Sequence, residues 1–136
     1  MANYHFHLTQ VKRSRGQSVI AQAAYRAGEK LYSTYYGESS DFTRKRGVVM
    51  AEICLPDHAL REYADRETLW NALEWAESGR KAQLAHSFDI TLMNEFSMEE
   101  NIEMARAFVQ EELVSRGMIA DFAIHDPVRP KGAEPN

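Results

Sequence analysis

Apolar and polar positions alternate in several short stretches of this chain. In residues 4–11, aromatic and aliphatic side chains fall on one face of an extended segment, while His5 and His7 fall on the other, because successive side chains of a strand point to opposite faces. The same alternation predicts further strands over residues 47–55, 84–92 and 118–125. We therefore expect strands that each pack one apolar face against a core.

Other stretches repeat their apolar residues at helical spacing, and each begins at a Ser or Asp suited to accept a hydrogen bond from a free amide of the first turn. In the longest of them, Ser97 is followed by Glu100, the signature of a capping box. Helices are predicted over residues 18–31, 65–77 and 97–117. Strands with one polar face and amphipathic helices together predict an α+β fold with a mainly antiparallel sheet packed on helices.

Two segments lack either pattern. Residues 33–46 are rich in Ser, Thr and Tyr and predict an irregular, mobile loop. Residues 127–136 contain three prolines and no apolar face, so we interpret them as a turn-rich connection to an element that the sequence does not contain. A chain of 136 residues is the size of one domain.

The composition is that of a folded soluble protein, with 44% hydrophobic and 26% charged residues. No apolar run approaches the roughly 18 residues that a membrane span requires, and the polar start has no signal-peptide core. These features predict a cytoplasmic protein with no membrane partner. The single cysteine, Cys54, cannot form an internal disulfide and lies in an apolar run, so we interpret it as a packed core residue.

The charges are unevenly distributed although the net charge is only −4. Residues 1–50 hold eight Lys and Arg against three Asp and Glu, whereas residues 51–136 hold eight against seventeen. The basic side chains flank a segment with four tyrosines, residues 16–36, as a phosphate backbone would require. A solvated surface with no nucleic-acid partner is the alternative interpretation.

Tyr25 and His125 are residues that could carry chemistry. Tyr25 follows a run of small residues that lets a ligand approach, but it could equally be a packed aromatic side chain. Asp89 and His125 fall on the polar faces of predicted strands, and one imidazole alone does not make a metal site. The chain has neither a phosphate-binding glycine loop nor a dinucleotide fingerprint, so no nucleotide cofactor is expected.

Several ordered motifs resemble the MobA/MobL family of plasmid mobilisation relaxases and together cover nearly the whole chain. They are Tyr-His-Phe at 4–6, Gly-Gln-Ser at 16–18, Ala-Ala-Tyr-Arg at 23–26, Asp-Arg-Glu-Thr-Leu-Trp-Asn at 65–71, Gly-Met-Ile-Ala-Asp at 117–121 and Ile-His at 124–125. The resemblance implies an HUH-type relaxase fold. It also implies a site- and strand-specific DNA nickase of conjugative transfer, which acts on single-stranded origin-of-transfer DNA with other relaxosome proteins.

The resemblance also implies roles for individual residues. Tyr25 matches the nucleophile, which attacks the phosphate at the nick site, keeps the 5′ phosphate and leaves a free 3′ hydroxyl. His125 matches the first of three histidines that hold a divalent ion, Mg²⁺ or Mn²⁺, which polarises that phosphate. The expected DNA contacts are Arg13, Arg15, Gln17, Arg26, Arg44, Lys45 and Arg46.

The chain departs from the family pattern in two places. In the family, the other two metal-binding histidines belong to a His-x-His pair on a following strand, which would lie beyond Asn136. We therefore expect an incomplete relaxase domain, with an incomplete metal site and little or no nicking activity. His86 and Ser87 stand where relatives commonly carry a basic residue and a Glu. Asp89 would then supply the nearby carboxylate, as proton acceptor, partner of a ligand histidine or plain surface charge.

Two other interpretations of the sequence remain open. The scaffold could serve as a non-enzymatic module that binds single-stranded DNA or assists a complete relaxase. It could also be an inert remnant that folds badly.

Overall fold

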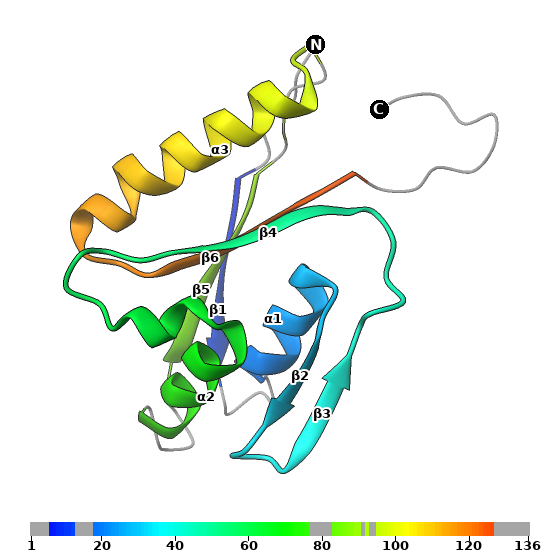
Figure 1. The fold of residues 1–136 in the computed structure, drawn as a ribbon, viewed down its shortest axis with the longest axis vertical. Coiled ribbons are helices and arrows are strands. Elements are labelled where there is room, and N and C mark those ends of the chain that lie inside the picture. Colours follow the sequence, from blue (N-terminus) through cyan, green and yellow to red (C-terminus); the bar gives the residue numbers. More distant parts are fainter. Residues whose placement is uncertain (1–5, 13–17, 77–82, 91, 93–94, 127–136) are drawn as a thin grey trace.

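A computed structural model describes residues 6–12, 18–76, 83–90, 92 and 95–126 of the chain (Figure 1). Within these ranges the chain is α+β, as the sequence predicts. The elements are β1 (Phe6–Lys12), α1 (Val19–Ala27), β2 (Lys30–Ser33), β3 (Glu38–Asp41), β4 (Val48–Cys54), the 3-10 turn η2 (Arg61–Ala64), α2 (Arg66–Ala76), β5 (Gln83–Ile90), α3 (Met98–Glu112), the 3-10 turn η3 (Val114–Arg116) and β6 (Ala120–His125). No helix in these ranges is both long and apolar enough to cross a membrane.

Every strand pairing in the described part of the chain is antiparallel. Strand β1 pairs with β5, β2 with β3, and β4 with β6, which gives three two-stranded sheets. His7 lies opposite Asp89 in the first pair, and Val48 lies opposite His125 in the third. The antiparallel prediction is therefore confirmed, although the described strands form separate pairs instead of one continuous sheet.

The β4–β6 pair separates two groups of helices (Figure 1). On one side, α1 and α2 pack around a core of Val19, Ile20, Ala23, Ala24 and Leu31, which Phe42, Trp70 and Leu73 cover. On the other side, α3 and the turn after it bury Val109, Val114 and Ala120 against β4 and β6. Cys54 packs against this second cluster as predicted, and burial raises the pKa of its thiol, which disfavours the reactive thiolate.

Helix α1 is shorter than predicted. It begins as expected, because the Ser18 side chain accepts a hydrogen bond from the Ala21 amide at 3.2 Å. It ends at Ala27 instead of residue 31, because Gly28 adopts the left-handed conformation (φ 66°). A Cβ at Gly28 would lie only 3.2 Å from the Val48 side chain, so glycine also permits the close approach of strand β4.

The predicted irregular loop over residues 33–46 is wrong for its first half. Residues 30–41 form the β2–β3 hairpin, in which Leu31 and Ser33 are buried. Helix α2 supplies the partners for its outer edge: Glu67 accepts a hydrogen bond from the Tyr32 amide at 2.7 Å, and Asn71 binds the main chain on both sides of Ser33. These partners are 35 to 39 residues away in the chain, so local pattern could not indicate them.

An ionic cluster around the buried Arg66 side chain joins α2 to β6 and to the segment after α1. The Arg66 guanidinium binds Asp121 and Glu29, each at 2.8 Å, and the Trp70 indole N–H donates to Asp121 at 2.8 Å. Burial disfavours the charge of Arg66, but the hydrogen bonds and charges of Asp121 and Glu29 outweigh it and raise the Arg66 pKa. The cluster sets the end of α1 against the strand that carries His125.

Helix α3 has the predicted capping box. The Ser97 hydroxyl accepts from the Glu100 amide, and the Glu100 carboxylate accepts from the Ser97 amide, both at 3.1 Å. The α-helix ends at Glu112, and a 3-10 turn then leads to Gly117, which adopts φ 88°. The single helix predicted up to residue 117 is therefore two elements.

Candidate functional site

A cavity of about 500 Å³ lies along helix α1, from its N-cap Ser18 to Arg26 in its last turn. Its walls come from α1, from the segment after β3 and from strands β5 and β6. The lining residues are Ser18, Ala21, Gln22, Tyr25, Arg26, Phe42, Asp89 and His125. The structure thus brings together four residues that the sequence analysis singled out from distant parts of the chain.

The Tyr25 side chain is 53% exposed at this cavity. Its ring packs against the Phe42 ring in a T-shaped arrangement, with ring centroids 5.3 Å apart and planes at 90°. The ammonium nitrogen of Lys45 lies 3.5 Å from the Tyr25 ring centroid. A side chain this exposed is no core residue, which argues against the interpretation of Tyr25 as a buried packing aromatic.

The end of helix α1 organises the site. The amides of Gly28 and Glu29 both donate to the Ala24 carbonyl. The carbonyls of the next two residues accept from side chains instead: Lys45 Nζ donates to the Tyr25 oxygen, and His125 Nε2 donates to the Arg26 oxygen, each at 2.8 Å. A helix C-terminus carries partial negative charge and open carbonyls, so it attracts such donors.

The bond to Arg26 determines which nitrogen of His125 could bind a metal. A carbonyl oxygen only accepts, so Nε2 carries a proton, and Nδ1 holds the free lone pair when the imidazole is neutral. Among the described residues no group of three His, Cys, Asp or Glu side chains could hold a metal ion. The donor set that the structure describes therefore does not make a metal site by itself.

Arg26 reaches across to strand β5. Its guanidinium donates a hydrogen bond to the hydroxyl of Ser87, which is buried. Ser87, one of the two positions that depart from the family pattern, thus has a structural partner at the cavity. The neighbouring His86 is exposed and is not among the cavity residues. Asp89, two residues further along β5, is exposed and lines the cavity.

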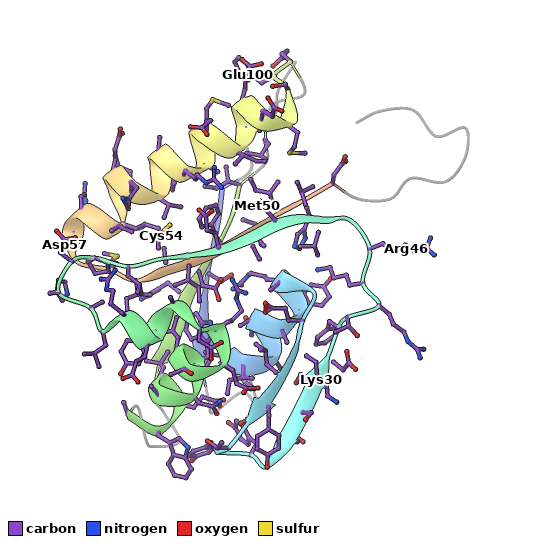
Figure 2. All side chains as sticks on the ribbon, in the orientation of Figure 1. Lys30, Arg46, Met50, Cys54, Asp57 and Glu100 are labelled. Carbon is purple, nitrogen blue, oxygen red and sulfur yellow. The ribbon has the colours of Figure 1, made fainter. Side chains whose placement is uncertain are left out.

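Among the predicted DNA contacts that the structure describes, Arg44, Lys45 and Arg46 do not line this cavity. Arg44 and Arg46 are exposed on the segment between β3 and β4, where Figure 2 shows Arg46 at the outer side of the molecule. Arg13, Arg15 and Gln17 lie outside the described residues. Gln22 lines the cavity although the sequence analysis did not single it out. Its position three residues before Tyr25, on the same helix face, was a signal available in the sequence.

The fold defines the class of protein: it is relaxase-like. A solved structure described as "Molecular Basis of Vancomycin Resistance Transfer in Staphylococcus aureus" superposes with a TM-score of 0.87 and 36% sequence identity, over 92% of this chain and 63% of that one. The model of the MobA/MobL family matches residues 17–135. The chain therefore belongs to the MobA/MobL family.

Curated relatives from several bacteria align over 93% of the chain. They include a probable mobilization protein MobA from Bifidobacterium longum, 33% identical over 126 residues, and a conjugal transfer protein TraA from Rhizobium radiobacter, 37% identical over 136 residues. A mobilization protein MobL from Acidithiobacillus ferridurans is 34% identical over 127 residues. The alignments cover 22%, 12% and 33% of these relatives, respectively, so the chain is similar to only part of each.

Proposed function

We propose that the chain acts in plasmid mobilisation as the DNA-nicking domain, or part of it, of a relaxase, with Tyr25 as the nucleophile. The observation that carries this proposal is the gathering of Tyr25, Arg26, Asp89 and His125 around one cavity. Membership of the MobA/MobL family and the names of the relatives support it.

The proposed reaction is a transesterification at one phosphodiester of the origin strand. The Tyr25 hydroxyl oxygen bonds to phosphorus, its proton passes to a base, and the bond from phosphorus to the 3′ oxygen breaks. The 3′ oxygen takes up a proton and leaves as a free hydroxyl, while the 5′ phosphate stays on the tyrosine. Asp89 is the carboxylate at the cavity and is our candidate for the base.

Cations in and near the cavity suit a single-stranded DNA substrate. Arg26 lines the cavity together with Tyr25, where its positive charge would offset the charge that develops on the reacting phosphate, and Lys45 lies over the Tyr25 ring. Arg44 and Arg46 are exposed nearby in the chain and would contact the strand further from the nick. Arg13, Arg15 and Gln17 remain predicted DNA contacts.

A divalent cation, Mg²⁺ or Mn²⁺, remains part of the proposal through His125. Of the His, Cys, Asp and Glu side chains in the described residues, His125 and Asp89 line the cavity. Further ligands would have to come from outside the described residues. We therefore assign no step of the reaction to the metal.

The direct test is a covalent adduct with DNA. The full gene product is incubated with single-stranded oligonucleotides that tile the DNA adjoining its gene and are labelled at the 3′ end. The incubations contain either Mn²⁺ or EDTA. The label should move with the protein in denaturing gels, and Tyr25→Phe should abolish the adduct. Tyr32→Phe is the matched control, because Tyr32 is also exposed, at 45%, but lies outside the cavity. Equal labelling of Tyr25→Phe would contradict the proposal.

One observation favours a second candidate, a non-enzymatic module that binds single-stranded DNA or assists another relaxase. It is the lack of a three-ligand metal cluster among the described residues. Such a module would bind origin strands with an affinity that falls steeply with salt, and no adduct would form under any metal condition.

A further inference from the structure

Lys45 contacts Tyr25 in two ways at once. Its ammonium nitrogen lies 3.5 Å from the centroid of the Tyr25 ring and donates a hydrogen bond to the Tyr25 carbonyl oxygen at 2.8 Å. A cation over an aromatic face is attracted by the negative charge of the ring face. The same nitrogen therefore holds both the side chain and the main chain of the candidate nucleophile.

The turn that carries Lys45 is itself held in place. The Lys45 amide donates to the Phe42 carbonyl, and the Phe42 amide donates to the Glu29 carbonyl, both at 3.0 Å. Asp41 fixes the start of the turn by accepting from the amide and the hydroxyl of Thr43. Residues 42–45 thus form a clamp that packs Phe42 against the Tyr25 ring and places Lys45 over the face of that ring.

Lys45 differs in exposure from the two arginines that flank it. Arg44 and Arg46 are exposed, whereas Lys45 is partly buried. Burial lowers the pKa of the Lys45 ammonium, and the charge of Arg26 lowers it further. An ammonium in that setting is a less available contact for a passing phosphate than an exposed guanidinium.

We infer that Lys45 is a positioning residue for Tyr25, which holds the phenol ring at the cavity for attack on the DNA phosphate. This inference rests on the proposed function. A loosely held phenol must be ordered at each encounter with DNA, whereas a ring fixed by Lys45 and Phe42 is already placed. Lys45 therefore acts on the rate of nicking, and its flanking arginines act on DNA affinity.

The test separates rate from affinity. Lys45→Met removes the charge and keeps the length of the side chain, and Lys45→Arg keeps a cation able to lie over the ring. Single-turnover adduct formation is measured at saturating DNA, and affinity is measured separately in a Tyr25→Phe background, which keeps the ring but not the nucleophile. Lys30→Met is the matched control, because Lys30 is an exposed lysine on strand β2 (Figure 2).

We expect Lys45→Met to lower the saturated rate on the order of 10-fold or more, because small misplacements of a reacting group are costly. Lys45→Arg should restore most of the rate, and Lys30→Met should change neither quantity. The aromatic proton resonances of Tyr25 should also shift in Lys45→Met without DNA, since the cation over the ring is gone.

Three results would overturn the inference, and they are distinguishable. A Lys45→Met variant that only weakens DNA binding, with a normal rate at saturation, would make Lys45 a phosphate contact like its neighbours. Unchanged Tyr25 resonances in that variant would show that the clamp does not exist in solution. The absence of any adduct from the unmodified protein would overturn the proposed function and, with it, this role of Lys45.

Discussion

Arg66 and Asp121 form a buried two-point ion pair between helix α2 and strand β6. Nε of Arg66 lies 2.8 Å from Oδ2 of Asp121, and Nη2 lies 2.9 Å from Oδ1. Both side chains are only 9% exposed. The pair links the Asp-Arg-Glu-Thr-Leu-Trp-Asn motif to the strand that ends at His125, so this motif supports the candidate site from a distance.

We expect Asp121→Ala to destabilise the fold by about 3 kcal/mol or more, because it leaves the Arg66 charge buried with only Glu29 to balance it. Urea unfolding monitored by circular dichroism measures the change. Glu52→Ala breaks the Arg106–Glu52 pair, whose side chains are 45% and 33% exposed, and serves as the control with a much smaller expected effect. Equal losses in the two variants would contradict the importance of the buried pair.

Asp65 caps helix α2 and gives a prediction that depends on pH. Its carboxylate accepts hydrogen bonds from the hydroxyl and the amide of Thr68. These bonds, the hydroxyl bond most, lower the pKa of Asp65 below the ordinary 3.8. A lowered pKa means that the folded state favours the charged carboxylate. This contribution to stability is therefore present at neutral pH and is lost as the pH falls below 3.8 through the folded-state pKa.

Asp65→Ala should cost about 1 kcal/mol of unfolding free energy at neutral pH and less in acid. Asp65→Asn is the control, because its side-chain oxygen still accepts from the Thr68 amide but does not titrate. Urea unfolding at neutral pH and near pH 3 compares the three proteins. A cost of Asp65→Ala that is the same at both pH values would show that the charge of the cap is irrelevant.

Much of the fold is predictable because it follows from local pattern. The capping box of Ser97 and Glu100 and the alternation in β4, β5 and β6 involve residues close together in the sequence. The β2–β3 hairpin is not predictable in this way, because each strand has only four residues and its outer edge binds α2. The early end of α1 depends on one glycine and on the approach of Val48.

The candidate site was predictable only in part. Tyr25, Asp89 and His125 were singled out by resemblance and by their place on polar faces, and the structure places all three at one cavity. The sequence analysis grouped Lys45 with Arg44 and Arg46 as one basic cluster. Their different surroundings depend on the turn after β3 and on the carbonyls left open where α1 ends, which local pattern does not reveal.

The hairpin edge gives a prediction for hydrogen exchange. Asn71 accepts from the Thr34 amide and donates to the Tyr32 carbonyl, each at 2.9 Å. Asn71→Ala removes both bonds, and with a net value of about 1 kcal/mol for one such bond, the Thr34 amide should exchange roughly five-fold faster. Amides in helix α3 serve as the internal control. Unchanged exchange at Thr34 would mean that Asn71 does not protect this edge.

The hydrogen bond from His125 to the Arg26 carbonyl predicts a single tautomer. The neutral imidazole should carry its proton on Nε2, because Nδ1–H would leave a lone pair facing the carbonyl oxygen at 2.8 Å. Long-range ¹H–¹⁵N correlation spectra distinguish the two ring nitrogens and show which of them carries the proton. The exposed His58 provides the comparison from the same sample. A proton on Nδ1 would contradict the hydrogen bond to the Arg26 carbonyl. Nδ1 would then not be the nitrogen through which His125 could bind a metal ion.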